Sequence, residues 1–138
     1  MAGFYKYAET EPGFVAVVDP DGTEHTAGDV LERANRYVHL LRSLGLEKGD
    51  SVAAVLPNGV LPVEVYLAAL QAGWYYVPIN YRLSAPEIAY IIKDSGAKAL
   101  VSHERYAGVI PAAAEEAGLP AANRLAHGTL EGLSLIHI

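Results

Sequence analysis

The sequence predicts an α/β fold: an open, mainly parallel, doubly wound sheet flanked by helices, with a β-hairpin near the N-terminus. Apolar strand-like runs alternate with amphipathic helical segments along the 138 residues, and the connections between them are short. The run 51–56 is almost continuously apolar, which is typical of a strand buried on both faces. Short strand–helix connections favour right-handed crossovers between parallel strands.

The N-terminal part of the chain is expected to form the hairpin and then a helix. The β-branched run 14–18 is followed by the turn residues 19–22, so the chain is predicted to return through 23–25. Thr26 offers an N-cap hydroxyl with Asp29 three residues on, and the helix should end at Gly45. Its apolar positions, at helical spacing, are Val30, Ala34, Val38 and Leu41.

Strands and helices are then expected in alternation. After the strand 51–56, a helix with an apolar stripe over 63–70 should end at Gly73, before a strand over 74–79. Ser84 and Glu87 form a capping box ahead of a helix that ends at 95–96, and 99–101 is the next strand. A last amphipathic helix is predicted over 106–117, where Gly118 and Pro120 stop it.

Composition excludes several functional classes. The net charge is −6, from 10 basic and 16 acidic residues without a basic run, which argues against binding to nucleic acid or to an anionic membrane. There is no cysteine, hence no disulfide, thiolate metal site or cysteine nucleophile, and this suits a reducing compartment. No apolar stretch reaches the roughly 18–20 residues of a transmembrane helix. We expect a soluble, cytoplasmic protein whose oligomeric state the sequence does not indicate.

The C-terminal hexamer 133–138 stands apart from the rest. It ends in an apolar run without a cap or a polar tail, and it resembles translated sequencing-adapter read-through. We therefore expect residues 1–132 to be one incomplete region of a larger domain and residues 133–138 to be a non-native tail.

A search for a ligand site in such a fold begins at the loops that follow strands. Neither a G-x-G-x-x-G turn nor a G-x-x-x-x-G-K-[ST] loop is present. The loop Pro57-Asn58-Gly59 follows the carboxyl end of a buried strand, where ligands of open sheets bind. A plain strand–helix connection is the favoured interpretation of this loop, with ligand contact as the alternative.

The remaining polar and aromatic candidates receive structural interpretations. The histidines are not at metal-binding spacing, the segment 19–22 is a turn and no calcium loop, and the adjacent pair Glu115-Glu116 is a solvated face. The serines are interpreted as strand-edge or capping residues. The aromatic run is interpreted as packing between sheet and helices, with stacking on a flat ligand as the less favoured alternative. The residues concerned are His25, His39, His103, His127, His137, Ser51, Ser84, Ser95, Ser102, Trp74, Tyr75 and Tyr76.

Several segments, in order, carry a family resemblance from about Glu9 to about Ala126. They are the helix 27–36, the strand and loop 49–58, the segment 66–80 with Arg82-Leu83 after it, the helix containing Glu87, and 94–101. Together they resemble the N-terminal part of AMP-binding, adenylate-forming enzymes of the acyl-CoA synthetase (fatty-acid–CoA ligase) type. The run 75–80 resembles these synthetases more than the adenylation domains of peptide synthetases, which favours a fatty or aryl carboxylic acid as substrate.

The resemblance implies a two-step reaction for the full-length parent. The acid attacks the α-phosphate of Mg-ATP to give an acyl-adenylate and pyrophosphate, and coenzyme A then displaces AMP. ATP, Mg²⁺ and CoA are thus implied for the parent and not for this fragment, since the family's phosphate loop, its acidic residues and its catalytic lysine lie beyond this chain. No catalytic, cofactor-binding or metal residue is therefore assigned, and Asn80 and Arg82 receive a structural role.

The chain alone should accordingly be inactive, and helices meant to pack on absent regions should favour aggregation or partial folding. Two other classes stay open. One is a stand-alone α/β module that binds a nucleotide or a protein without catalysis. The other is a small Rossmann-type enzyme, which the missing glycine fingerprint disfavours.

Overall fold

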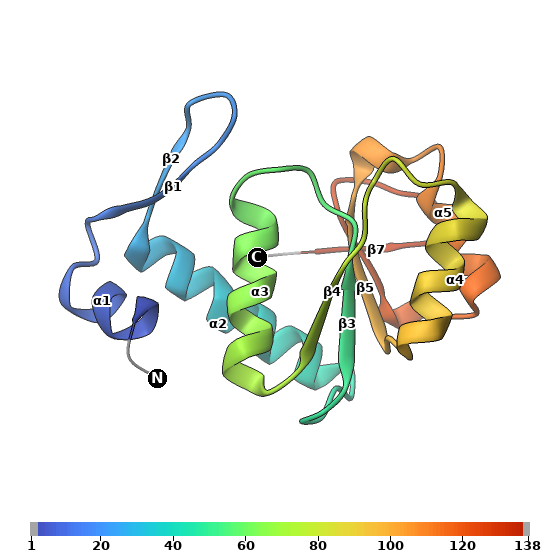
Figure 1. Cartoon of the computed structure of the whole chain (residues 1–138), viewed down its shortest axis with the longest axis horizontal. Coiled ribbons are helices and arrows are strands. Elements are labelled where there is room, and N and C mark those ends of the chain that lie inside the picture. The colour runs from blue at the N-terminus through green and yellow to red at the C-terminus, as the bar shows by residue number, and fades with distance from the viewer. Residues whose placement is uncertain (1–2, 137–138) are drawn as a thin grey trace.

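The computed structural model describes residues 3–136, which form a parallel sheet with helices on both faces and an N-terminal arm at one end (Figure 1). The arm consists of α1 (Phe4–Thr10), β1 (Val15–Val18) and β2 (Glu24–Thr26). The elements that follow are α2 (Ala27–Ser43), β3 (Ser51–Ala54), α3 (Val60–Ala72), β4 (Tyr75–Pro78), α4 (Ala85–Ser95), β5 (Ala99–His103), α5 (Ile110–Ala117), β6 (Arg124–His127) and β7 (Ser134–Leu135). Short 3₁₀ turns occupy Glu104–Tyr106 and Ala121–Asn123.

The five-stranded sheet confirms the predicted doubly wound topology. Its strand order is β4-β3-β5-β6-β7, and every neighbouring pair is parallel. The chain moves outward from β3 to β4 and then returns past β3 to β5. The connections therefore reverse direction between β3 and β5, and such a switch point leaves a crevice outside the carboxyl ends of the two strands.

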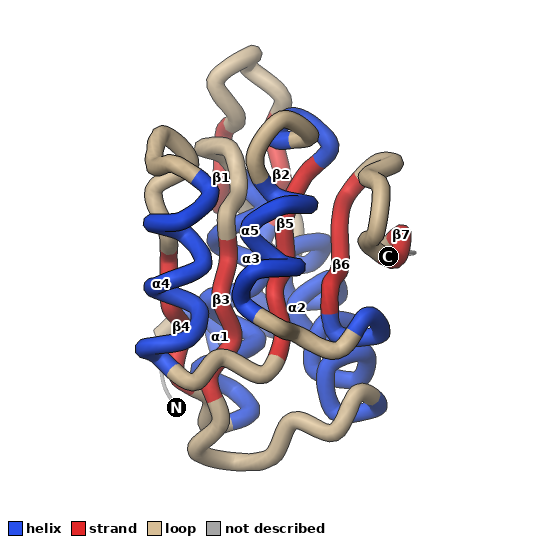
Figure 2. The backbone as a smooth tube through the Cα atoms, turned by 90° about the vertical axis from the view of Figure 1, so that its right-hand side faces the viewer, coloured by secondary structure: helices blue, strands red, loops and turns tan. Residues whose placement is uncertain are grey.

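Side chains 52–55, at β3 and just after it, point to alternate faces of the sheet, and helices pack on both faces. Val52 and Ala54 pack with α2 and α3, whereas Ala53 and Val55 pack with α4 and α5. Figure 2 shows α4 and α5 in front of the strands and α2 and α3 behind them. Because side chains alternate along a strand, an apolar run is what a two-sided core requires.

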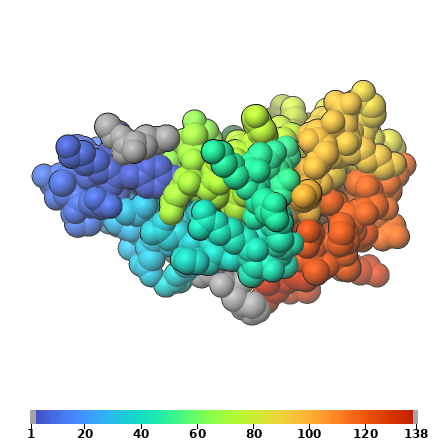
Figure 3. Space-filling model, turned by 90° about the horizontal axis from the view of Figure 1, so that it is seen from below, coloured from blue at the N-terminus to red at the C-terminus, as the bar shows by residue number. Residues whose placement is uncertain are grey.

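The N-terminal arm packs against α2 and α3. Val30 and Ala34 of α2 meet Val60 and Leu67 of α3 in a third apolar cluster, with Phe4 against it. The antiparallel pair β1–β2 is the predicted hairpin. Figure 3 shows the arm at one end of an elongated molecule.

The predicted helix ends are largely confirmed. The Thr26 hydroxyl accepts the Asp29 N–H at 3.2 Å, and Ser84 and Glu87 form the capping box. Gly73, at φ 79°, is the left-handed cap expected at the end of α3. Among residues 3–136, no helix is long and apolar enough to cross a bilayer.

Other boundaries differ from the prediction. The helix expected over 106–117 begins at Ile110, because the chain first makes a 3₁₀ turn over 104–106 and the helix takes Pro111 into its first turn. The structure also contains α1, β6 and β7, which the sequence did not predict. In the hexamer predicted to be non-native, Ser134 pairs with β6 and Ile136 is buried, while residues 137–138 lie outside the described part.

Candidate functional site

A crevice of about 260 Å³ lies outside the carboxyl ends of β3 and β5, at the switch point of the sheet. The loop after β3 contributes one wall, the hairpin turn another, and the end of β5 the third. Two residues of the predicted loop, Pro57 and Asn58, therefore do reach the position where ligands of open sheets bind. The lining residues are Asp19, Pro20, Asp21, Pro57, Asn58, Val60, Leu61, His103 and Arg105.

The hairpin turn closes over the start of α3. Asp19 Oδ1 accepts the Val60 N–H at 2.9 Å, and its Oδ2 lies 2.6 Å from His25 Nε2. The N-cap residue of α3 is Gly59, which has no side chain, so Asp19 serves as the cap from 41 residues away. A Cβ at Gly59 would lie 2.6 Å from Asp19 Oδ1, so this contact needs the glycine. The carboxylate thus occupies the electropositive end of the helix.

The opposite wall of the crevice carries the cationic side chain. His103 Nδ1 accepts the Arg105 N–H at 3.0 Å. Burial and the nearby Arg105 charge lower the pKa of His103, so its ring is neutral at neutral pH. Hydrogen bonds from Thr23 lower the pKa of Asp21, which keeps a negative charge on the hairpin side. The crevice consequently carries both signs of charge, with the carboxylates on the hairpin and the guanidinium on the β5 side.

A polar layer that starts at His103 agrees with a structural role for the half-buried His127. The rings of His103 and His127 stack with centroids 6.5 Å apart, and His127 Nε2 meets the hydroxyl of buried Tyr37. Burial, with His103 and Arg33 nearby, lowers the pKa of His127 to about 4. His39 is exposed, and His137 lies outside the described residues. Across residues 3–136 no three His, Cys, Asp or Glu side chains cluster as metal ligands would.

The interpretation of the serines as strand-edge or capping residues is right for three of the four and wrong for Ser102. Ser84 is the cap of α4, Ser51 begins β3, and the Ser95 hydroxyl donates to the Ile92 carbonyl at the end of α4. Ser102 is neither a cap nor the first or last residue of its strand. It is fully buried in β5 between β3 and β6, and its hydroxyl donates to the Val55 carbonyl at 3.0 Å.

The aromatic interpretation is right for two of three residues. Trp74 is buried, and Tyr76 packs edge-to-face on Tyr66 of α3 with ring centroids 5.7 Å apart. The prediction that Tyr75 packs inside is wrong, because this side chain is 68% exposed. Tyr75 is the first residue of β4, which lies at the edge of the described sheet.

The acidic pair and the β4–α4 loop have local roles. Glu115 and Glu116 are exposed, and Glu115 pairs with Arg124 at 2.8 Å. Asn80 Oδ1 accepts the Arg82 N–H at 2.9 Å, and the Arg82 guanidinium lies 5.7 Å from the centroid of the Tyr81 ring. These contacts suit the loop-fixing role expected for Asn80 and Arg82.

Sequence reasoning missed the most unusual polar residue of the chain. Glu64 lies in the middle of α3 and is 1% exposed. A lone carboxylate inside the apolar run 60–70 was the available signal, since ionisable residues are rarely fully buried.

Comparison of the sequence with known proteins identifies the family of the chain. The family model described as "AMP-binding enzyme" matches residues 4–131. The chain belongs to the AMP-binding enzyme family. It is 37% identical over 114 residues to a long-chain-fatty-acid–CoA ligase of Mycobacterium tuberculosis, a match that covers 82% of the chain and 23% of that ligase. It is also 37% identical over 93 residues to a feruloyl-CoA synthase of an Amycolatopsis species, covering 67% of the chain and 19% of the synthase.

Solved structures of AMP-binding enzymes share the fold. A benzoate CoA ligase from Burkholderia xenovorans superposes with a TM-score of 0.81 at 28% identity, over 92% of this chain and 25% of the ligase. A Mycobacterium tuberculosis fatty acyl CoA synthetase gives 0.78 at 33% identity, over 90% and 25%. The chain thus spans about a quarter of the length of these relatives and corresponds to an N-terminal piece of them. The predicted family and fold are confirmed.

Proposed function

We propose that the chain is the N-terminal part of an ATP-dependent acid–CoA ligase that joins a fatty or aryl carboxylic acid to coenzyme A through an acyl-adenylate. The observation that carries the proposal is the family match over residues 4–131. The relatives are described as ligases for long-chain fatty acids and as a feruloyl-CoA synthase, which supports both substrate classes. We place the parent in fatty acid metabolism on the same ground, and in the cytoplasm because a cysteine-free chain suits a reducing compartment.

The crevice of this chain offers little that would hold the triphosphate of ATP. The Val60 N–H at the start of α3 is bonded to Asp19, and that carboxylate together with Asp21 would repel a triphosphate. Arg105 is the single Lys or Arg side chain among the lining residues. We therefore assign to residues 3–136 the role of a scaffold, and to other parts of the parent the groups that bind ATP, Mg²⁺ and CoA.

The scaffold role predicts that the 138-residue chain is inactive alone. Stabilising the charge of a transferring adenylyl group needs positioned cations and donors, and we assign those groups to other parts of the parent. We expect no ATP–pyrophosphate exchange above a no-enzyme blank with hexadecanoate, benzoate or ferulate, while the complete mycobacterial ligase serves as positive control. Exchange that rises with the concentration of the purified chain would contradict the scaffold role.

The parent activity is tested with a chimera. The region of the mycobacterial ligase that matches this chain is replaced by residues 4–131, and acyl-CoA formation is measured. We expect activity from the chimera and none when it carries Leu100→Asp, because Leu100 is fully buried in β5. Residues 133–138, which we propose to be foreign, are left out of the chimera. Adding them should not raise its activity.

A further inference from the structure

Glu64 places a buried carboxyl group between α2 and α3 with one oxygen unsatisfied. Its Oε2 is buried and accepts no hydrogen bond from any described residue. The cation facing it is Arg33 of α2, whose Nη1 lies 3.5 Å away and whose side chain is 42% exposed. At that separation an ionised pair attracts without a hydrogen bond, so Arg33 only partly offsets the burial of a carboxylate.

The surroundings of Glu64 are mixed in charge. From α2 it faces Arg33 and buried Tyr37, and from the hairpin it senses His25 and Asp19. Burial raises the pKa of Glu64 to about 7; Arg33 and His25 act against this rise and Asp19 adds to it. Burial and the neighbouring Glu64 also hold the pKa of Tyr37 far above its usual range, so Tyr37 stays neutral.

The position of Glu64 connects this group to the crevice. It lies one helical turn after Val60, whose N–H is bonded to Asp19 and whose side chain lines the crevice. A neutral carboxylic acid suits the packed interface of α2 and α3. An ionised one requires Arg33 to approach to hydrogen-bonding distance or water to enter between the two helices.

We propose that the buried Glu64 carboxyl is a proton-operated latch between α2 and α3, closed when the carboxyl is protonated and packs as a neutral group. The latch is weakened when that proton is lost to solvent, because Arg33, 3.5 Å away, only partly compensates the buried charge. Opening of the latch loosens the first turns of α3, and with them one wall of the crevice. The device responds to pH in the neutral range.

The latch is tested by comparing the 138-residue chain with its Glu64→Gln variant, which keeps the shape of the side chain and cannot ionise. Folded-to-unfolded ratios are measured by urea titration at pH 5 and pH 8. With a pKa of 4.5 unfolded and about 7 folded, the wild-type ratio divided by the variant ratio should fall about 70-fold between the two pH values. The division removes the contribution of every titrating group that does not interact with the Glu64 charge.

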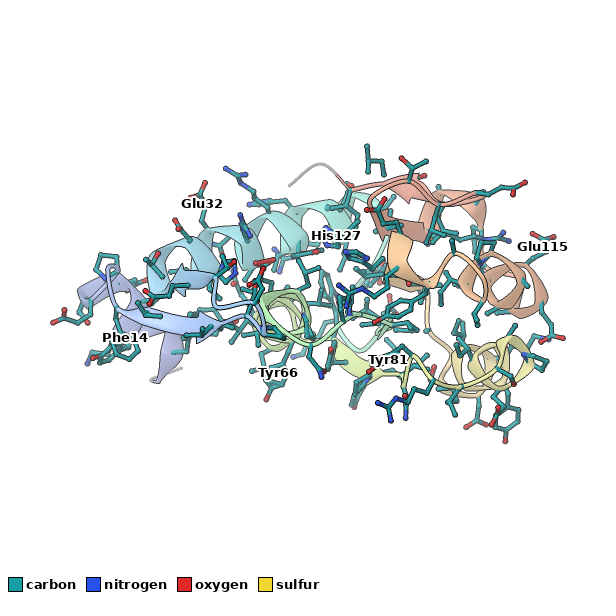
Figure 4. All side chains as sticks on the ribbon, turned by 90° about the horizontal axis from the view of Figure 1, so that it is seen from above. Phe14, Glu32, Tyr66, Tyr81, Glu115 and His127 are labelled. Carbon is teal, nitrogen blue, oxygen red and sulfur yellow. The ribbon has the colours of Figure 1, made fainter. Side chains whose placement is uncertain are left out.

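Glu32→Gln is the matched control. Glu32 points outward from α2 (Figure 4) and pairs with Arg36 at the surface, so the same quotient should stay constant within about twofold. A constant quotient for Glu64→Gln as well would overturn the latch.

A second readout does not depend on how stable the variant is. Infrared difference spectra of the wild-type chain should show the carbonyl stretch of a protonated carboxylic acid at pH 6, where exposed carboxylates are ionised. The band should disappear by pH 8. Absence of the band at pH 6, or its persistence in Glu64→Gln, would overturn the proposal.

Discussion

Replacing Asp19 by alanine tests whether the hairpin turn caps α3. The variant loses the acceptor for the Val60 N–H and the partner of His25, two contacts of 2.9 and 2.6 Å. Removing an N-cap acceptor costs about 1 kcal/mol. The half-buried contact with His25 adds about another 1 kcal/mol. We expect the free energy of unfolding to fall by about 2 kcal/mol, which lowers the urea midpoint by about 1 M when m is near 2 kcal/mol/M.

Two matched variants separate the cap from a general effect on the turn. Asp19→Asn keeps an oxygen for the Val60 N–H and should lose about half as much stability. Asp21→Ala changes the same turn, but Asp21 is exposed and bonds only its neighbour Thr23, so the midpoint should scarcely move. Urea unfolding followed by circular dichroism measures all three. Equal losses for Asp19→Ala and Asp21→Ala would refute the capping role.

Three further outcomes are expected from the same structure. Leu41→Ala should cost about 2–5 kcal/mol in urea unfolding because Leu41 is fully buried, whereas Leu70→Ala, at a residue with 41% exposure, should cost far less. Ser84→Ala should cost about 1 kcal/mol through loss of the α4 cap, and Ser84→Thr should restore most of it in thermal melts. Because His127 is neutral in the folded protein, the free energy of unfolding should be highest above pH 6.5 and should fall as the pH falls toward 4. His127→Gln should make this fall in stability smaller by about 2 kcal/mol. His39→Gln should leave it unchanged. Each expectation would be contradicted if the two variants named for it changed stability equally.

The strands that the sequence predicts are those with continuous apolar runs. The predicted runs 51–56, 74–79 and 99–101 coincide with β3, β4 and β5, and turn residues precede each of them. β6 was not predicted because it contains only two apolar residues, which lie between Arg124 and His127. α1 was not predicted because it is only seven residues long and its N-cap residue, Gly3, has no side chain to signal a helix start.

The site depends on contacts between residues far apart in the chain. Asp19 reaches Val60 across 41 residues, and Tyr37 meets His127 across 90. Periodicity carries no information about such pairs, so the loop Pro57-Asn58-Gly59 could be placed at a strand end but not beside the hairpin turn. Burial of Ser102 and exposure of Tyr75 likewise follow from strand order, which places β5 inside the sheet and β4 at its edge.

The rate of acyl-CoA formation by the chimera tests the assignment to acid–CoA ligases most directly. Residues 4–131 of this chain, in place of the matching region of the mycobacterial ligase, should retain activity within about a hundredfold of that ligase, a barrier increase of less than about 3 kcal/mol. A chimera that folds with the melting behaviour of the ligase but forms no acyl-CoA would show that this region does not serve as the scaffold of such an enzyme.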